Sequence, residues 1–366
     1  MNEQERILVM KRFADYYSQA SFGIPYLENR EFGIGNRKKI DARHLSFFNE
    51  ADFKRYLVQN TPMFVSHSIA YYEFPGATPI QKKQRTGADL VFDLDIHAEG
   101  KYGAYAKLDE VKQDAIRLVE EFIIGDFAVD GESVKIVFSG NRGYHIHVND
   151  IRFRNIGGDE RKEIVDYIKG TGLDYIQFFS EEEIGPRLKR LSGPKPDEDG
   201  YRGRLARAFV KTLNEKPSLI SRKFSKDNER ELFISGIKEG NWSRTTFRSS
   251  ELLKRMKNVA DSLPVRAVDT DAAVTHDLSK LIRVPNSIHG DTGLIARTVD
   301  DIEKFEPFRD AVIQGGGTMK IMFTEDVPEL RYMDGATEAY KKGDVADVPE
   351  PLAIFYILRD SATSSI

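Results

Sequence analysis

The chain has 366 residues, with 54 Lys and Arg against 58 Asp and Glu, a formal net charge of −4, and no cysteine. This length allows one large or two modest domains with a sizeable core. The lack of cysteine excludes disulfides and cysteine-ligated zinc or iron–sulfur sites. The sequence contains no run of about 18 apolar residues, the length needed to span a membrane. The slightly acidic balance argues against a uniformly basic nucleic-acid binder but allows a local basic track. The N-terminus lacks the pattern of a signal peptide, so a cytoplasmic protein is expected.

The first half of the chain predicts both helices and strands. Residues 4–20 place apolar side chains at helical spacing, from Ile7 to Tyr17. Residues 88–96 alternate as a strand with one buried face, and residues 108–124 carry an apolar helical stripe. Residues 134–148 then predict two strands around a glycine-containing turn.

The composition shifts at about residue 158. Residues 158–260 are highly charged and mostly helical in pattern, with a loop at 192–200. Between 202 and 230, nine basic residues face three acidic ones. This run could follow a nucleic-acid backbone or could be a solvated helix face, and both interpretations stay open. Strand and turn signals return after 262, and the acidic stretch around 343–350 is expected to pack loosely.

Two aspartates stand inside the expected strand at 88–96. Asp93 and Asp95 are two residues apart, so their side chains share a face with Cβ atoms roughly 6–7 Å apart. This spacing suits two divalent cations bridged by oxygen ligands. A solvated strand face is the alternative, but aspartate is a poor strand former, and its presence in an apolar run is typical of a functional site. Asp89, on the same face, is interpreted as a strand-start residue.

The turn at residues 139–145 reads Ser-Gly-Asn-Arg-Gly-Tyr-His. Its two glycines let the backbone approach a ligand closely. Ser139, Arg142 and His145 supply a hydroxyl, a planar guanidinium and an imidazole, all of which can bind phosphate oxygens. The alternative is a tight hairpin with an exposed arginine. His147, two residues on, is interpreted as a structural histidine rather than a metal ligand.

A third polar element follows residue 268. Asp271 precedes a short amphipathic helix, and residues 283–290 then read Arg-Val-Pro-Asn-Ser-Ile-His-Gly. Asp271 can complete a set of three carboxylates, while Arg283 and His289 can reach a triphosphate. Alone, this element would be a loop with two polar residues. Together, the three motifs predict a site that binds divalent metals and a polyphosphate and joins nucleotides.

In this order the motifs resemble those of the catalytic small subunit of archaeal and eukaryotic DNA primase, in its archaeal form. The resembling segments are residues 30–33, 90–95, 139–145 and 281–294. The resemblance implies an α+β fold, with a mixed β-sheet catalytic core flanked by helices and a mainly helical inserted domain. It divides the chain into a discontinuous core at 1–157 and 262–345, an accessory insert at 158–261, and a C-terminal tail at 346–366.

The resemblance also implies roles for individual residues. Asp93, Asp95 and Asp271 correspond to the ligands of catalytic Mg²⁺ or Mn²⁺. The triphosphate contacts correspond to Ser139, Arg142, His145, Arg283 and His289. The implied enzyme is a nucleotidyltransferase, a DNA-directed RNA polymerase of primase type, which makes short RNA or DNA primers on single-stranded DNA from nucleoside triphosphates. Its implied partner is the primase large subunit, in a heterodimer.

The chain departs from the family pattern at two places. Asn141 stands where many relatives have a second arginine, which weakens one phosphate contact. Many relatives also carry a Cys/His zinc module just after the acidic pair, whereas residues 96–111 contain one histidine and no cysteine. We therefore expect no structural zinc.

Two other functions fit parts of the sequence. A repair or translesion polymerase on the same catalytic core would share the site and differ in template and partners. A non-catalytic subunit that binds nucleic acid or holds an assembly together is the other alternative, which the mutually repelling aspartates disfavour.

Overall fold

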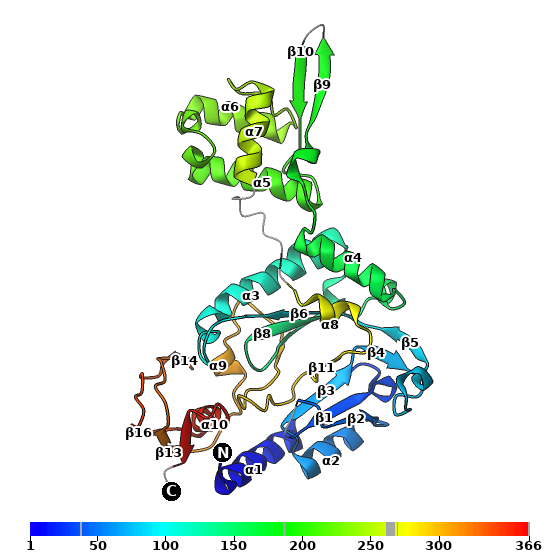
Figure 1. Ribbon diagram of the computed structural model, residues 1–366, viewed down its shortest axis with the longest axis vertical. Helices are drawn as coiled ribbons and strands as arrows, with labels where there is room; N and C mark the ends of the chain where they lie inside the picture. The colour runs from blue at the N-terminus through cyan, green and yellow to red at the C-terminus, as the bar shows by residue number, and fades with distance from the viewer. Residues whose placement is uncertain (37–38, 186–187, 261–267, 269, 365–366) are drawn as a thin grey trace. The chain divides into compact units, whose positions relative to one another are not determined.

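The computed structural model describes residues 1–36, 39–185, 188–260, 268 and 270–364. The chain forms two compact units. Unit 1 comprises residues 1–116, 129–165 and 269–366, and unit 2 comprises residues 117–128 and 166–268. Helices and antiparallel sheets alternate along the chain, which confirms the predicted α+β class (Figure 1).

Unit 1 contains the two sheets that matter for the site. One sheet has the strand order β11-β3-β1-β2 and the other β12-β7-β8-β6, with antiparallel neighbours throughout. The strands of these sheets are β1 (Phe32–Gly35), β2 (Ala42–Leu45), β3 (Phe64–Ser68), β6 (Leu90–Asp95), β7 (Val134–Phe138), β8 (Gly143–Val148), β11 (Leu281–Arg283) and β12 (Thr298–Val299).

Smaller strand groups complete unit 1. A three-stranded sheet has the order β16-β13-β17, and two strand pairs are β4-β5 and β14-β15. Their bounds are β4 (Ala70–Tyr72), β5 (Arg85–Ala88), β13 (Thr318–Phe323), β14 (Arg331–Tyr332), β15 (Gly335–Ala336), β16 (Val345–Pro349) and β17 (Ala362–Ser364). The helices that lie wholly or partly in unit 1 are α1 (Glu3–Gln19), α2 (Glu50–Asn60), α3 (Leu108–Arg117), α4 (Gly158–Lys169), α8 (Ala272–His276), α9 (Pro307–Asp310) and α10 (Glu350–Leu358).

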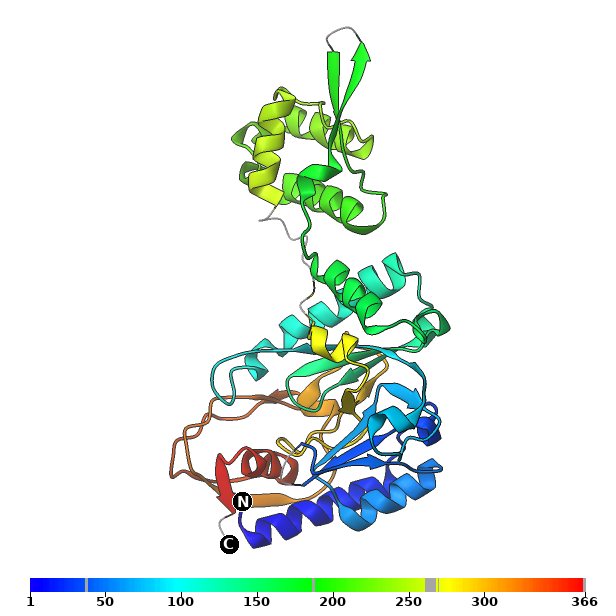
Figure 2. The same ribbon diagram turned by 45° about the vertical axis from the view of Figure 1, so that its right-hand side comes forward.

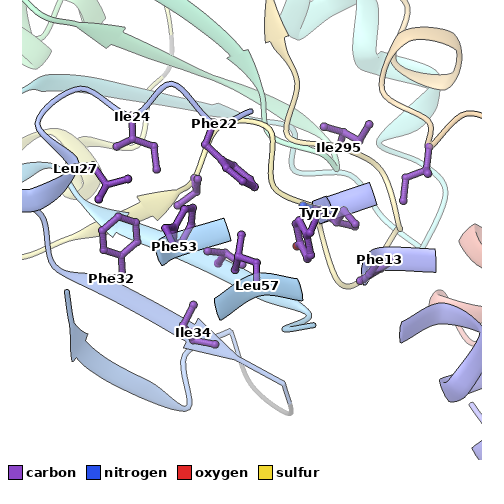
Figure 3. Packing of buried hydrophobic residues seen from close by; sticks show 14 of the residues in the cluster. Phe13, Tyr17, Phe22, Ile24, Leu27, Phe32, Ile34, Phe53, Leu57 and Ile295 are labelled. Carbon is purple, nitrogen blue, oxygen red and sulfur yellow. Dashed lines mark hydrogen bonds between the residues drawn. The ribbon is translucent and has the colours of Figure 1, made fainter. Parts of the chain in front are cut away.

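Aromatic side chains fill the layer between the first sheet and the two helices α1 and α2, which lie side by side beneath it (Figure 2). Figure 3 shows Phe13 and Tyr17 of α1, Phe53 of α2 and Phe32 of β1 in this cluster. The ring centroids of Phe32 and Phe53 are 4.9 Å apart. Burial of such large rings makes this layer a firm base for the strands above it.

The two main sheets meet through buried side chains of β3, β6, β8 and β11. The rings of His67 on β3 and His147 on β8 have centroids 6.3 Å apart. Burial lowers the pKa of His67 to about 3 and holds that of His147 well below its ordinary value. Both rings are therefore neutral at neutral pH.

Three local predictions need adjustment. The helix expected at 4–20 is α1, but Ile7 is 63% exposed and Val9 takes the buried position. The helix expected over 108–124 is α3, which continues from Leu118 to Asp126 as a π-helix. The stretch expected to pack loosely contains β16, which pairs with β13, and the helix α10 that follows is buried within unit 1.

Unit 2 packs around Trp242, which is fully buried. It contains α5 (Gly200–Glu215), α6 (Asp227–Lys238), α7 (Ser249–Ala260) and a hairpin of β9 (Ser180–Gly185) with β10 (Leu188–Ser192). Part of the basic run is structural, because Arg204 forms two ion pairs. Its Nε atom lies 2.9 Å from Glu121 Oε2, and its Nη2 atom lies 2.5 Å from Asp126 Oδ2. Among the described residues, no helix combines the length and apolar character needed to cross a membrane.

Candidate active site

The acidic pair and the glycine turn lie on adjacent strands. β6 and β8 pair so that Asp93 faces His145 and Asp95 faces Gly143. The Asp93 Oδ1 atom is 3.6 Å from His145 Nε2, and the Arg142 Nε atom donates to Asp95 Oδ2 at 3.0 Å. The strand register thus brings the first two predicted motifs together.

Asp93 is the most perturbed carboxyl group of the site. Burial, and then the negative charges of Asp95 and Asp271, raise its pKa to about 7. Two like charges near a buried carboxylate disfavour its ionised form, and a bound cation would relieve that repulsion.

Asp271 reaches the site through a backbone contact. Its N–H donates to the carbonyl oxygen of Asp93 at 2.9 Å, at the edge of β6 that faces away from β8. Its side chain caps α8, because Oδ1 accepts from the N–H of Ala273 at 2.9 Å. In the described part of the chain, no three His, Cys, Asp or Glu side chains converge as a finished metal site. A backbone hydrogen bond therefore connects Asp271 to Asp93. Their carboxylates contact different groups, His145 for Asp93 and the N–H of Ala273 for Asp271.

The turn at 139–145 is organised by Ser139. Its hydroxyl oxygen accepts from the N–H of Gly143 at 3.2 Å and from that of Asn141 at 3.4 Å. Gly140 has a φ of +80°, and a Cβ atom there would lie 2.9 Å from the Cβ of His289. Glycine is therefore needed at 140 both for its backbone conformation and for the close approach of the third motif.

Gly143 is needed for the contact of β8 with β6. A Cβ atom at this position would collide with the carbonyl oxygen of Leu94 and lie 2.6 Å from Asp95 Oδ1. We expect Gly143→Ala to displace β8 from the acidic pair and to lower the free energy of unfolding by roughly 1–3 kcal/mol. Urea unfolding measures this. Gly317→Ala is a control for substitution at a glycine, because its φ lies outside the left-handed region and no described atom lies within 4 Å of a Cβ atom built there. Equal effects of the two changes would contradict the steric argument.

The third motif supplies two deeply placed side chains. Burial lowers the pKa of Arg283 to about 10, and its Nη1 atom is buried without a hydrogen-bond partner among the residues that the structure describes. His289 is 5% exposed, and its Nδ1 accepts from the N–H of Asp291 at 3.2 Å, which leaves the proton on Nε2. The hydroxyl of Thr292 donates to the carbonyl oxygen of Gly140 at 2.6 Å and so joins this motif to the glycine turn.

Burial lowers the pKa of His145 to about 3, so the ring is neutral at neutral pH. Like the Nη1 atom of Arg283, its Nδ1 atom is buried and has no hydrogen-bond partner within the described residues. Unpaired buried polar atoms of this kind point to a ligand or water, because leaving them unsatisfied is costly. All eight predicted site residues lie in unit 1, within or directly beside β6, β8, β11 and the turns that follow them: Asp93, Asp95, Ser139, Arg142, His145, Asp271, Arg283 and His289.

Two features of this region escaped the sequence analysis. The positive charge of Lys39 acts to lower the pKa values of both Asp93 and His289, although burial raises that of Asp93 overall. The only signal for it in the sequence is its position in a run of three basic residues at 37–39. Asp89 is more than a strand-start residue, because it is 6% exposed and its Oδ2 lies 2.6 Å from Arg30 Nη2. The resembling segment at 30–33 therefore supports the base of β6 rather than the site itself.

Comparisons with known proteins agree with this geometry. The family model described as DNA primase small subunit matches residues 92–301, which include every residue of the candidate site. The chain is 34% identical to the DNA primase small subunit PriS of Methanocella arvoryzae, and the alignment covers 99% of both chains. It is 31% identical to that of Methanothrix thermoacetophila over 99% of both chains, and 32% identical to that of Archaeoglobus fulgidus over 98% of both. With more than half of its length matched by the family model and nearly all of it aligned with these relatives, the chain belongs to the DNA primase small subunit family.

Proposed function

We propose that this protein is the catalytic subunit of a DNA primase and makes short primers on single-stranded DNA by nucleotidyl transfer from nucleoside triphosphates. The observation that carries the proposal is the clustering of unlike charges at one end of β6 and β8. The coupled carboxyl groups of Asp93, Asp95 and Asp271 stand beside unpaired donors on His145 and Arg283. This is the arrangement that a metal-bound triphosphate requires.

Asp93, Asp95 and Asp271 would hold Mg²⁺ or Mn²⁺. Carboxylates are the ligands these cations prefer, and burial together with the negative charges of Asp95 and Asp271 raises the pKa of Asp93. When bound, the cations would make the attacking 3′-hydroxyl more acidic and offset the charge of the leaving pyrophosphate. The donor set contains no cysteine, and the proposal includes no structural zinc.

The remaining site residues bind and orient the triphosphate. His145 and His289 are neutral and can donate one N–H each, and Arg283 carries an unpaired buried Nη1. Ser139 shapes the turn through two N–H groups, and Arg142 lies against Asp95 at the mouth of the site. Donors fixed in this way stabilise charge on the leaving group without reorganising during the reaction.

The proposed substrates are nucleoside triphosphates and a single-stranded DNA template, and the proposed partner is the primase large subunit in a heterodimer. The exposed cations of unit 2 between 202 and 230 could follow the template backbone. They include Lys211, Lys216, Arg222, Lys223 and Lys226. Phosphate contacts of this type would make template affinity fall with salt.

Asp95→Asn tests the proposal. Purified protein is incubated with single-stranded template, nucleoside triphosphates and Mg²⁺ or Mn²⁺, and dinucleotide formation is measured without a primer. Loss of one metal-binding carboxylate should lower the rate by roughly 10³-fold, which corresponds to about 4 kcal/mol of transition-state stabilisation. Glu99→Gln is the matched control, because it removes an exposed carboxylate four residues further along the chain.

The outcomes separate the alternatives. De novo product that disappears in Asp95→Asn but persists in Glu99→Gln supports a primase. Extension that needs a supplied primer favours a repair or translesion polymerase on the same core. Template binding without product under either metal would leave a non-catalytic nucleic-acid-binding subunit.

A further inference from the structure

The outer edge of β6 is held by the short helix α8 rather than by another strand. β6 is the last strand in the order β12-β7-β8-β6, so the carbonyl groups on its far side have no strand partner in the described part of the chain. Two of them are bound by the segment that carries Asp271. The N–H of Asp271 donates to the carbonyl oxygen of Asp93 at 2.9 Å, and the hydroxyl of Thr275 donates to that of Val91 at 2.8 Å.

The distance between the two donors in the α8 segment matches the distance between the two acceptors on β6. Residues 271 and 275 are four apart at the start of a helix, which corresponds to a rise of about 6 Å along one helix face. Val91 and Asp93 are two apart on a strand, which corresponds to about 6.6 Å and to carbonyl groups that point the same way. The two hydrogen bonds can therefore form together in one register, and a shift of α8 by one residue would break both.

We infer that Thr275 is a positioning residue, whose hydroxyl fixes α8 on the edge of β6 and thereby keeps Asp271 in register with Asp93. This inference rests on the proposed function, in which Asp271 is the third metal-binding carboxylate. Thr275 is fully buried and touches neither substrate nor metal in this scheme, so it acts only through Asp271. Of the two contacts, only this one depends on a side chain and can be removed by substitution.

The fold does not depend on this hydroxyl alone. Val274, the neighbour of Thr275, packs in a cluster with Ile69, Val91 and Ile282. This apolar contact stays when Thr275 is replaced by valine, which has nearly the same volume but no donor. Thr275→Val should therefore leave the protein folded while α8 loses its fixed register, because the carbonyl of Val91 loses its partner.

The experiment compares wild type, Thr275→Val and Thr275→Ser in the full chain. Hydrogen exchange of a peptide covering residues 270–278 reports the Asp271 N–H contact without any metal. Mn²⁺ binding, followed by the electron paramagnetic resonance signal of the free ion, reports the carboxylate set without any turnover. Circular dichroism confirms that each variant is folded.

We expect Thr275→Val to exchange at least about tenfold faster in this peptide and to bind Mn²⁺ about 10–100-fold more weakly, as for other residues that orient metal ligands. Thr275→Ser keeps the donor and should match wild type in both readouts. In an Asp271→Asn background, Thr275→Val should weaken Mn²⁺ binding no further, because the residue through which it acts is gone.

Faster exchange with unchanged Mn²⁺ affinity would overturn the inference and leave Thr275 with a structural role only. Unchanged exchange would overturn it as well. Failure of the proposed function looks different: wild type would then bind Mn²⁺ no better than Asp95→Asn and make no primer. The exchange data would in that case still decide whether Thr275 holds α8.

Discussion

Asp93→Asn should abolish primer synthesis and at the same time make the protein more stable at pH 8. The substitution removes a proposed metal-binding carboxylate, so the rate of dinucleotide formation should fall by roughly 10³-fold or more. It also removes a partly buried negative charge that two neighbouring carboxylates repel. A residue that costs stability and is needed for activity is the usual signature of a functional site.

The stability gain has a definite pH dependence. The pKa of Asp93 is about 7 in the folded protein against an ordinary value of 3.8, so the folded state holds this proton more tightly than the unfolded state. Stability therefore falls as pH rises from about 4 to about 7, and the loss is complete above that range. Asparagine has no such proton. We expect the free energy of unfolding of Asp93→Asn to exceed that of wild type by about 2–4 kcal/mol at pH 8 and by less at pH 5.

Urea unfolding at pH 5 and pH 8 in the presence of EDTA measures the difference. The chelator matters because a cation bound to folded wild type would itself stabilise the protein and reduce the difference in free energy of unfolding between the two proteins. Glu99→Gln, which removes an exposed carboxylate nearby, should change stability by less than about 0.5 kcal/mol at either pH. If Asp93→Asn were less stable than wild type at pH 8, the electrostatic account of the site would be wrong.

The acidic pair could be predicted because its signal is local. Two aspartates in an apolar alternating strand conflict with their own propensity, and that conflict is visible in six residues. The glycine turn is similar, since it needs small residues at fixed positions. Asp271 had no such signal, because a single aspartate before a short helix is common. Its place in the carboxylate set was a weak expectation that the family resemblance strengthened, and its contact with Asp93 spans 178 residues of chain.

Contacts between distant segments explain most of what the sequence did not predict. The bond from Thr275 to Val91 and the influence of Lys39 on Asp93 depend on strand order, which periodicity does not specify. The β9–β10 hairpin was missed for a different reason. The side chains of β9, Ser180–Gly185, are almost all exposed, so this strand has no apolar face and gives no alternating pattern.

Asp89→Asn should have the opposite effect on stability from Asp93→Asn, although both residues lie on the same strand face. Asp89 pairs with Arg30 at 2.6 Å, and the two side chains are 6% and 1% exposed. Arg30 Nη1 also donates to the carbonyl oxygen of Ser68 at 2.7 Å, which ties the pair to the end of β3. Removing the carboxylate leaves a buried guanidinium without its counter-charge. We expect a loss of about 3–5 kcal/mol in the free energy of unfolding.

An exposed ion pair provides the matched control. Lys304 and Asp301 are separated by 2.7 Å, nearly the same distance, but their side chains are 84% and 48% exposed. Asp301→Asn should lower the free energy of unfolding far less than Asp89→Asn does, because solvent screens the exposed pair. Burial rather than distance then accounts for the difference between the two substitutions, and similar losses at the two sites would contradict this.

A double-mutant cycle separates the pair itself from the charge left behind. Arg30→Met alone should lower the free energy of unfolding about as much as Asp89→Asn, because it leaves the buried carboxylate of Asp89 without a counter-charge. The combination should cost clearly less than the sum of the two, because no uncompensated charge then stays in the interior. Folded Asp89→Asn should still make primers at a temperature well below its melting point, since Asp89 holds the base of β6 and not the metals. Loss of synthesis by a fully folded Asp89→Asn would instead move this residue into the catalytic set.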